Sequence, residues 1–336
     1  MIGGAGVVVA SDDGFVRFYD PSLDKVYWER RLNASIYASL VVDRDRRRVV
    51  VATTSGAVAA LDLRGGVAWA TKTSVPIFAT PTILPTSALL MIAGFNSRCI
   101  GIGLERGEIT FDRPLPPPWH RAYGGSASHR DPYASPAATT DGRAIFCSGE
   151  AVIAVSAEGK EDWRCEIGDS IKSSPVVLHQ TGEVAVCAVD GRCIFLDAAS
   201  GSVARETHLG AKVTASGAVS GSVLVVANTW GSVTAFDIGT RDVIWTSAHG
   251  GPRSYTSFTV LPSGDFVATA ESGNVVCLQR DTGRLLWETS QVLGLPDHDP
   301  ALDITPVAAT DGNMYGGSYS GFIYRFAFRR QGEGPV

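Results

Sequence analysis

A unit of on the order of 40 residues recurs along this 336-residue chain, and such a period restricts the possible folds more than any other feature of the sequence. The stretch SDDGFVRFYDPSLDKVYWERRL at 11–32 has the same pattern as TSGAVAALDLRGGVAWAT at 54–71. In each, a Gly turn leads to an apolar segment ending in Asp, then a second turn and a short run containing Trp. We call that Trp the closing position. Its occupants, separated by 41, 42, 52, 42, 40 and 42 residues, are Trp28, Trp69, Phe111, Trp163, Arg205, Trp245 and Trp287.

Two further positions recur once per unit, in register with the closing position, and form columns when the units are aligned. A turn residue stands four positions before it, as Gly65, Gly107, Gly159, Gly201 and Gly283, with Asp24 and Arg241 in the other two units. A column of Ser or Thr runs through ATP (79–81), ASP (134–136), SSP (173–175) and ITP (304–306). Degraded copies of that column are ASL (38–40), ASG (215–217) and TSF (256–258).

Each unit contains four short segments rich in β-branched residues and bounded by Gly, Asp, Ser and Pro. This is the pattern of strands joined by tight turns. Repeated four-stranded units of this length are typical of a β-propeller, in which each blade buries its faces against its neighbours. We therefore predict an all-β fold, a propeller of four-stranded antiparallel blades.

The strand count favours eight blades over seven. Eight second strands and eight third strands can be found, but only seven first and seven fourth strands. Residues 1–10 offer no first strand, and the chain stops after GFIYRFAFRR. We therefore expect residues 1–336 to form a single propeller domain whose first and last blades are incomplete. The missing first strand favours a natural polypeptide that begins upstream of Met1, of which this chain would be a fragment or C-terminal module.

The Trp four residues after Gly, preceded by an LD pair and followed by an xSP strand, resembles the PQQ-type (quinoprotein-like) propeller repeat. Quinoprotein alcohol dehydrogenases, the bacterial outer-membrane assembly lipoprotein and the C-terminal propeller of beta-alanine-activating (aminoadipate-semialdehyde-dehydrogenase-like) enzymes share this repeat. The resemblance implies a fold and leaves the function open. Our leading hypothesis is a ligand- or protein-binding scaffold that is accessory to an adenylating, biosynthetic enzyme system.

The net charge, the N-terminal sequence and the cysteine pattern limit which kinds of partner and which cellular compartment we expect. A net charge of -5 gives no basic excess, so we expect neither nucleic acid nor a membrane surface as a partner. The N-terminus has no basic segment followed by a long apolar run, so we expect a cytoplasmic protein. Six cysteines without a CxxC pair are interpreted as buried free thiols, and no metal is expected.

The mouth of the central channel is the predicted binding site. The residues two positions before each Ser or Thr of the column should surround it, because ligands of propellers usually bind where the inter-blade loops meet. They are Tyr37, Phe78, Tyr133, Lys172, Thr214, Tyr255 and Asp303. Four aromatic rings with one Lys and one Asp suit a protein partner or a small anionic ligand. The alternative is that these side chains only plug the channel.

The second hypothesis is that the protein is an enzyme. Two inter-blade connections, 111–134 and 287–305, are longer than the others, and long loops in a compact fold are often functional. They carry the candidate catalytic residues His129, Asp131, His298 and Asp299, while Arg130 could contact an anion. Against catalysis, no HxH or HxxxH pair fixes two ligands locally, and DHDP at 297–300 also suits a turn.

A quinone-dependent dehydrogenase is the remote alternative. The resemblance implies that such enzymes hold PQQ beneath a vicinal disulfide, whereas this sequence has no adjacent cysteines. We predict that the purified protein will not oxidise alcohols when supplied with PQQ and calcium, as measured by dye reduction. Stoichiometric quinone binding accompanied by dye reduction would contradict this prediction.

Overall fold

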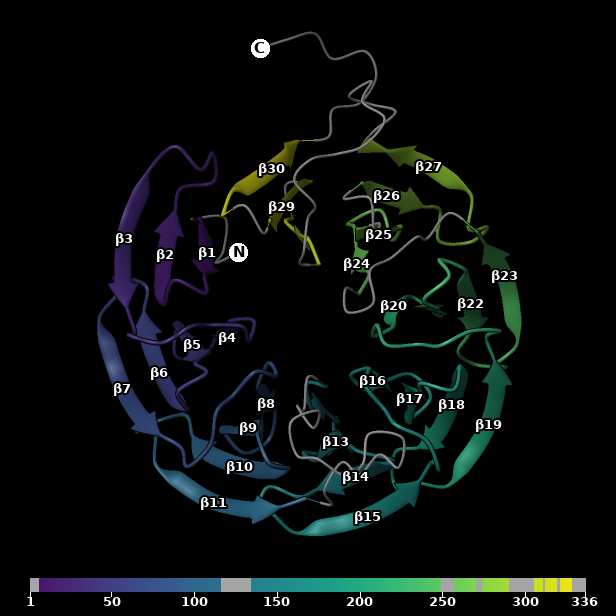
Figure 1. Ribbon diagram of the computed structural model, residues 1–336, viewed down its shortest axis with the longest axis horizontal. Helices are drawn as coiled ribbons and strands as arrows, with labels where there is room; N and C mark the ends of the chain where they lie inside the picture. The colour runs from purple at the N-terminus through teal and green to yellow at the C-terminus, as the bar shows by residue number, and fades with distance from the viewer. Residues whose placement is uncertain are drawn as a thin grey trace, which may run out of the picture.

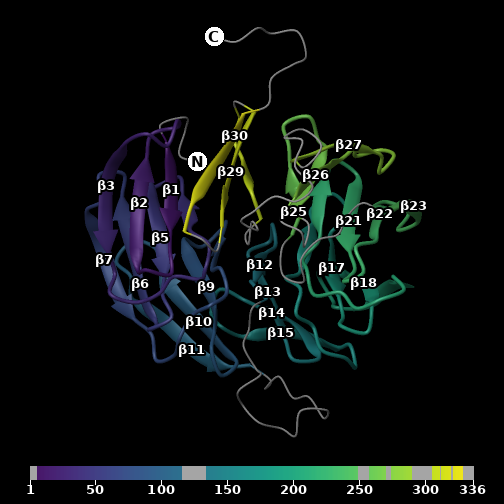
Figure 2. The same ribbon diagram turned by 45° about the horizontal axis from the view of Figure 1, so that its top comes forward.

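The computed structural model describes residues 6–115, 134–248, 257–269, 274–289, 305–310, 312–318 and 321–327. The strands of these residues form eight antiparallel sheets, which stand as blades around a central axis (Figures 1 and 2). Within each blade the chain runs from the inside of the ring to the outside. The prediction of an eight-bladed, all-β propeller of the PQQ type is confirmed.

Successive strands pair as simple meanders, and blades are numbered here in chain order. Blade 1 contains β1 (Val7–Ala10), β2 (Phe15–Tyr19) and β3 (Val26–Arg31). Blade 2 contains β4 (Val41–Asp43), β5 (Arg48–Ala52), β6 (Ala57–Asp62) and β7 (Val67–Lys72). Blade 3 contains β8 (Thr82–Leu84), β9 (Leu89–Gly94), β10 (Arg98–Gly103) and β11 (Ile109–Pro114). Blade 4 contains β12 (Ala137–Ala138), β13 (Ala144–Ser148), β14 (Ala151–Val155) and β15 (Glu161–Glu166).

The second half of the ring repeats this order. Blade 5 contains β16 (Val176–Leu178), β17 (Glu183–Cys187), β18 (Arg192–Asp197) and β19 (Val203–His208). Blade 6 contains β20 (Ala218–Ser220), β21 (Val223–Ala227), β22 (Val233–Asp237) and β23 (Val243–Ser247). Blade 7 contains β24 (Thr259–Val260), β25 (Phe266–Thr269), β26 (Val275–Leu278) and β27 (Leu285–Glu288). Blade 8 contains β28 (Val307–Ala308), β29 (Asn313–Gly317) and β30 (Ile323–Ala327).

Blades 1 and 8 have three strands each in the described part of the chain, as the strand count predicted. Blade 1 has no first strand there, and blade 8 has no fourth strand. The two blades are in direct contact. The Tyr315 hydroxyl donates a hydrogen bond of 2.8 Å to the backbone carbonyl of Pro21. Val7, Ala309 and Tyr315 form a small buried cluster beside this bond, packed against Val9 and Leu23. The ring is therefore closed by packing between its ends.

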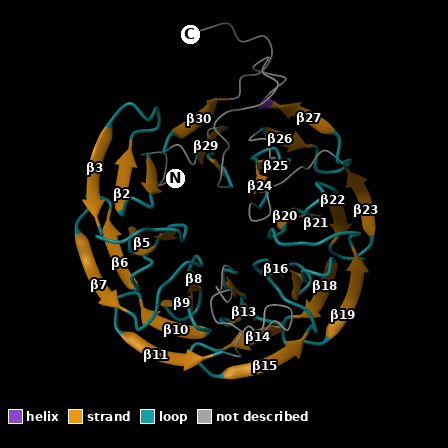
Figure 3. Ribbon diagram, in the orientation of Figure 1, coloured by secondary structure: helices purple, strands orange, loops and turns teal. Residues whose placement is uncertain are grey.

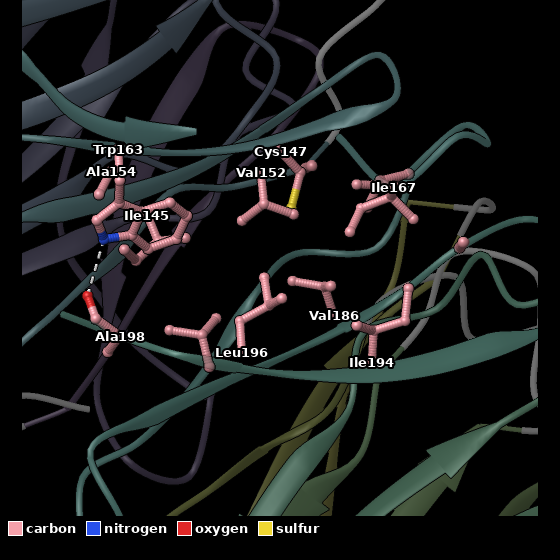
Figure 4. Close-up of a cluster of buried hydrophobic side chains, with 14 residues drawn as sticks. Ile145, Cys147, Val152, Ala154, Trp163, Ile167, Val186, Ile194, Leu196 and Ala198 are labelled. Atoms are coloured by element: carbon pink, nitrogen blue, oxygen red, sulfur yellow. Dashed lines mark hydrogen bonds between the residues drawn. The ribbon is translucent and has the colours of Figure 1, made fainter. Parts of the chain in front are cut away.

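The closing position organises the contact between neighbouring blades. In each of the seven fourth strands that the structure describes, a β-bulge immediately precedes the closing residue in its pairing with the third strand. Trp163 of blade 4 is buried and donates its indole N–H to the carbonyl of Ala198 in blade 5, at 3.0 Å (Figure 4). Trp28, Trp69 and Trp245 make the same bond to the next blade, at 3.0, 2.8 and 2.8 Å.

Glycine is required beneath five of the closing aromatic rings. At Gly201 the φ angle is 72°, and an added Cβ would lie 2.4 Å from Cε3 of Trp163. The one closing residue that has no ring also has no glycine beneath it, which supports this steric explanation. Where the closing residue is Arg205 instead of an aromatic, the turn of the next blade carries Arg241, also at positive φ (64°). Ion pairs then join blades 5 and 6, from Arg205 to Asp242 at 3.1 Å and from Arg241 to Glu183 at 2.7 Å.

We predict that Trp163→Ala will destabilise the fold by about 3–5 kcal/mol, since it removes a buried ring and leaves a cavity between two blades. Arg205→Ala at the equivalent position is the matched control, and its exposed ion pair should cost about 0–1 kcal/mol. Denaturant unfolding of both variants measures the difference. Equal losses for the two would show that the indole is not the main contact between blades.

Candidate functional site

A series of hydroxyl groups links the inner strands around the channel. The backbone N–H of Ser39 donates to Oγ1 of Thr80 at 2.9 Å, and that of Thr80 donates to Oγ of Ser135 at 3.0 Å. The same bond recurs from Ser135 to Ser174, from Ser174 to Ser216 and from Ser257 to Thr305, at 2.9, 2.8 and 2.8 Å. These are the Ser and Thr residues of the sequence column. The bonds therefore place the same residue at the same level of the channel in blades 2 to 6, and again in blades 7 and 8.

The inter-blade loops and the loops between second and third strands, drawn in teal in Figure 3, lie on one face of the ring. Backbone hydrogen bonds join the two kinds of loop. Phe95 donates to the carbonyl of Pro76 at 2.9 Å, and Thr229 donates to that of Lys212 at 2.8 Å. We call this surface the mouth face. Its loops are fixed by such bonds, so the side chains that they carry have defined positions.

Part of the predicted binding ring can be located on this face. Tyr37, Phe78, Lys172 and Thr214 lie in the loops that lead into β4, β8, β16 and β20. Lys172 is exposed, and the described residues place no carboxylate within ion-pair distance of it. The remaining ligand candidates, Arg130, Tyr133, Tyr255 and Asp303, lie outside the described residues. The catalytic candidates His129, Asp131, His298 and Asp299 also lie outside them.

Three aromatic rings form a continuous cluster on the mouth face. The Tyr37 and Phe78 ring centroids are 5.8 Å apart, and those of Phe78 and Phe95 are 6.1 Å apart, with tilted planes. These separations are typical of favourable aromatic pairs. Tyr37 remains 64% exposed, so most of its surface is available to a ligand. Sequence analysis named Tyr37 and Phe78 and missed Phe95, which comes from a different loop.

Trp230 is a second feature that the sequence analysis missed. Its side chain is 82% exposed, yet its backbone is held firmly by Asn228. The Asn228 amide donates to the carbonyl of Leu209 at 2.8 Å, and its oxygen accepts from the N–H groups of Trp230 and Ser232 at 3.0 and 3.1 Å. The signal in the sequence was a Trp inside the polar Gly turn NTWG, away from the closing position.

The described residues offer little for catalysis. No group of three or more His, Cys, Asp and Glu side chains suited to a metal is found among them. The cysteines are free, and five of the six are buried. Burial raises the pKa of Cys99 and of Cys277 to about 12, so neither thiol ionises readily enough to act as a nucleophile. Within the described chain, no helix has the length and apolar character needed to cross a membrane.

Comparison with known proteins gives a family model and several similar structures. The model described as outer membrane protein assembly factor BamB matches residues 2–149 and 148–332. BamB from Moraxella catarrhalis is similar in structure, with a TM-score of 0.75 and 17% identity over 96% of this chain and 94% of its own. The computationally designed Ika8 protein gives a TM-score of 0.74 and 15% identity, over 98% and 95% of the two chains.

The C-terminal WD40 domain of Sif2 is also similar, with a TM-score of 0.78 and 10% identity over 98% of this chain and 94% of that domain. At these low identities the likeness establishes the fold alone. A comparison with curated protein sequences gives no significant match.

Proposed function

The chain belongs to the family of the outer membrane protein assembly factor BamB, and on that premise we propose that it is a scaffold whose mouth face binds a protein partner. The observation that carries this proposal is Trp230, a large ring that is 82% exposed on a loop with a fixed backbone. Hot spots of protein interfaces are enriched in Trp and Tyr held in this manner, because little side-chain entropy is lost when they are buried.

The distribution of aromatic groups favours a protein over a small ligand. Tyr37 and Phe95 come from blades 2 and 3, whereas Trp230 comes from blade 6, in the opposite half of the ring (Figure 1). A macromolecular partner can cover both anchors at once. Lys172 adds an exposed positive charge that would attract acidic groups and accelerate association. A small anionic ligand near Lys172 is the alternative occupant of the mouth face.

A finer proposal concerns the biological setting. The repeat resembles that of the C-terminal propeller of beta-alanine-activating enzymes, and the protein would then serve as an accessory module of an adenylating enzyme system. Co-purification with an adenylating enzyme tests this role, and recovery of a partner with no connection to adenylation would replace it. The protein-scaffold proposal does not depend on the identity of that partner.

We predict that Trp230→Ala and Tyr37→Ala will each weaken binding of the partner recovered from native cells by about 30-fold or more, the loss expected for an interface hot spot. Their melting temperatures should change little, since both side chains are mostly exposed. Isothermal titration with the purified partner measures the effect.

Tyr27→Ala provides the matched control, because Tyr27 is a tyrosine that is 48% exposed on the outer strand β3, away from the mouth face. Unchanged affinity in both mouth variants, or an equal loss in the control, would contradict the proposed interface. An additional Lys172→Ala change should slow association and reduce its dependence on salt.

A cytoplasmic location is part of the proposal, and a pair of thiols can test it. Cys187 and Cys193 face each other across β17 and β18. Because Ala188 donates to Arg192 at 2.9 Å next to them, they form a non-hydrogen-bonded pair. The Cα atoms of such pairs are about 4.5 Å apart, within the range that disulfides span. An oxidising compartment would therefore tend to join these two residues.

We predict six free thiols when protein from its native cells is quenched in acid, denatured and titrated. In the Cys187→Ala control the count should be five in any compartment, because five cysteines remain and Cys193 has lost its opposite neighbour. Four thiols in the wild type with five in the control would reveal the Cys187–Cys193 disulfide and contradict the cytoplasmic location.

A further inference from the structure

The inner edge of blade 1 differs from that of every other blade. In blades 2 to 8 a short first strand pairs with the second strand on its channel side. In blade 1 the second-strand position is held by β1, whose partner in the described residues is β2 alone. β1 is therefore the strand of blade 1 nearest the channel axis (Figure 1).

Burial reflects this difference. The second strands β9, β13, β17, β21 and β25 are buried at every residue, and β29 is buried in its central three residues beneath β28. In β1, Val8, Val9 and Ala10 all remain partly exposed. Apolar surface that a first strand covers elsewhere is thus left accessible in blade 1.

The register shows which backbone groups face the open edge. The N–H of Ser11 donates to the carbonyl of Phe15 at 3.1 Å, so these two residues form a hydrogen-bonded pair. From there, non-hydrogen-bonded and hydrogen-bonded pairs alternate along β1 and β2. Val9 is bonded to Arg17, whereas Val8 stands opposite Phe18 in a non-hydrogen-bonded pair. The N–H and C=O of Val8 therefore point away from β2 and toward the open edge. In blade 2 the equivalent residue, Val50, pairs with Val41 of the first strand.

Seven internal copies define the sequence that fits this position. Two positions before each of these first strands stands a Ser or Thr, often followed by Pro, and the strand itself contains mostly small, β-branched or other apolar residues. The segments are SLVVD (39–43), TPTIL (80–84), SPAAT (135–139), SPVVL (174–178), SGAVS (216–220), SFTVL (257–261) and TPVAA (305–309). The bonds of the hydroxyl series run from Ser39 in blade 2 to Ser216 in blade 6 and from Ser257 in blade 7 to Thr305 in blade 8, so its two ends are Ser39 and Thr305. A strand in blade 1 with the same pattern would join these two ends.

We propose that the open inner edge of blade 1 binds an extended segment of a partner polypeptide with the pattern Ser/Thr-Pro followed by three small or apolar residues. The segment pairs antiparallel with β1, and a backbone hydrogen bond to Val8 fixes its register. All four Ser/Thr-Pro dipeptides of this sequence lie directly before the first strands of blades 3, 4, 5 and 8, so none of them is available to blade 1. The site uses none of the aromatic groups of the mouth face and stands without the proposed function.

A pair of N-methylated peptides tests the proposal. The probe is the labelled, end-capped peptide SSPVVLHQ, which copies residues 173–180. In blade 5, Val176 pairs with Ala185 through backbone bonds, whereas the N–H of Val177 points away from β17. N-methylation at the Val176 position should weaken binding to the full chain at least tenfold in fluorescence anisotropy. The same change at the Val177 position should alter it by less than about twofold, because that N–H is not used in pairing.

The complementary variant is Val8→Pro. It removes the N–H that faces the open edge and none that bonds to β2, and Pro is tolerated at such an edge position. Peptide binding should fall at least tenfold, while the control Val8→Thr keeps the N–H and should bind within about twofold of the wild type. Trp230→Ala should leave peptide binding unchanged, which separates this site from the mouth face. Should Val8→Pro not fold, the two N-methylated peptides still decide the question.

Hydrogen exchange at Val8 completes the test. The amide should exchange rapidly in the free protein and slowly with the unmodified peptide bound. A slowly exchanging Val8 amide in the free protein would mean that the edge is already occupied, and this would overturn the proposal. Failure of the peptide to bind, or equal binding by both N-methylated peptides, would overturn it as well.

Discussion

The fold depends on one contact, an indole that lies on a glycine of the next blade and donates its N–H to a carbonyl there. Trp28, Trp69, Trp163 and Trp245 all make this bond to a residue 35 positions later. The contact combines burial of a large apolar ring with a satisfied polar atom, so it favours one geometry between sheets that could otherwise slide over each other. The blades have similar spacing because the same contact recurs.

The arrangement of blades could be predicted from the sequence because local requirements mark them. Trp163 needs Gly201, and a Gly four positions before the closing residue is visible in five of the seven units without a structure. The incomplete blades were visible for the same reason, since the Ser/Thr column has no copy before Ser39. By contrast, the Tyr37–Phe78–Phe95 cluster depends on how loops from two blades meet, and no sequence period reports that distance. Trp230 lies between the second and third strands of blade 6, so the Ser/Thr column, which marks inter-blade loops, does not indicate it.

The mouth face combines a rigid framework with variable side chains. The bond from Phe95 to Pro76 and that from Thr229 to Lys212 tie each turn to the preceding inter-blade loop. Substitutions at exposed positions such as Tyr37 therefore change what the face can recognise without changing where the loops lie. This separation of framework and contact residues explains how propellers of one architecture acquire different partners. The predicted roles of His129 and His298 stay predictions, because both residues lie outside the described chain.

The way in which the ends of the ring meet has a consequence for how the chain folds. Blades form from consecutive strands, and most contacts between blades join neighbours in sequence, as the Trp bonds across 35 residues do. The bond from Tyr315 to Pro21 joins residues 294 positions apart. Loop closure over such a length carries a large entropic cost, which is repaid only after the intervening blades are packed. During synthesis, the early blades can therefore assemble in order as they emerge from the ribosome, and the circle closes as the final step.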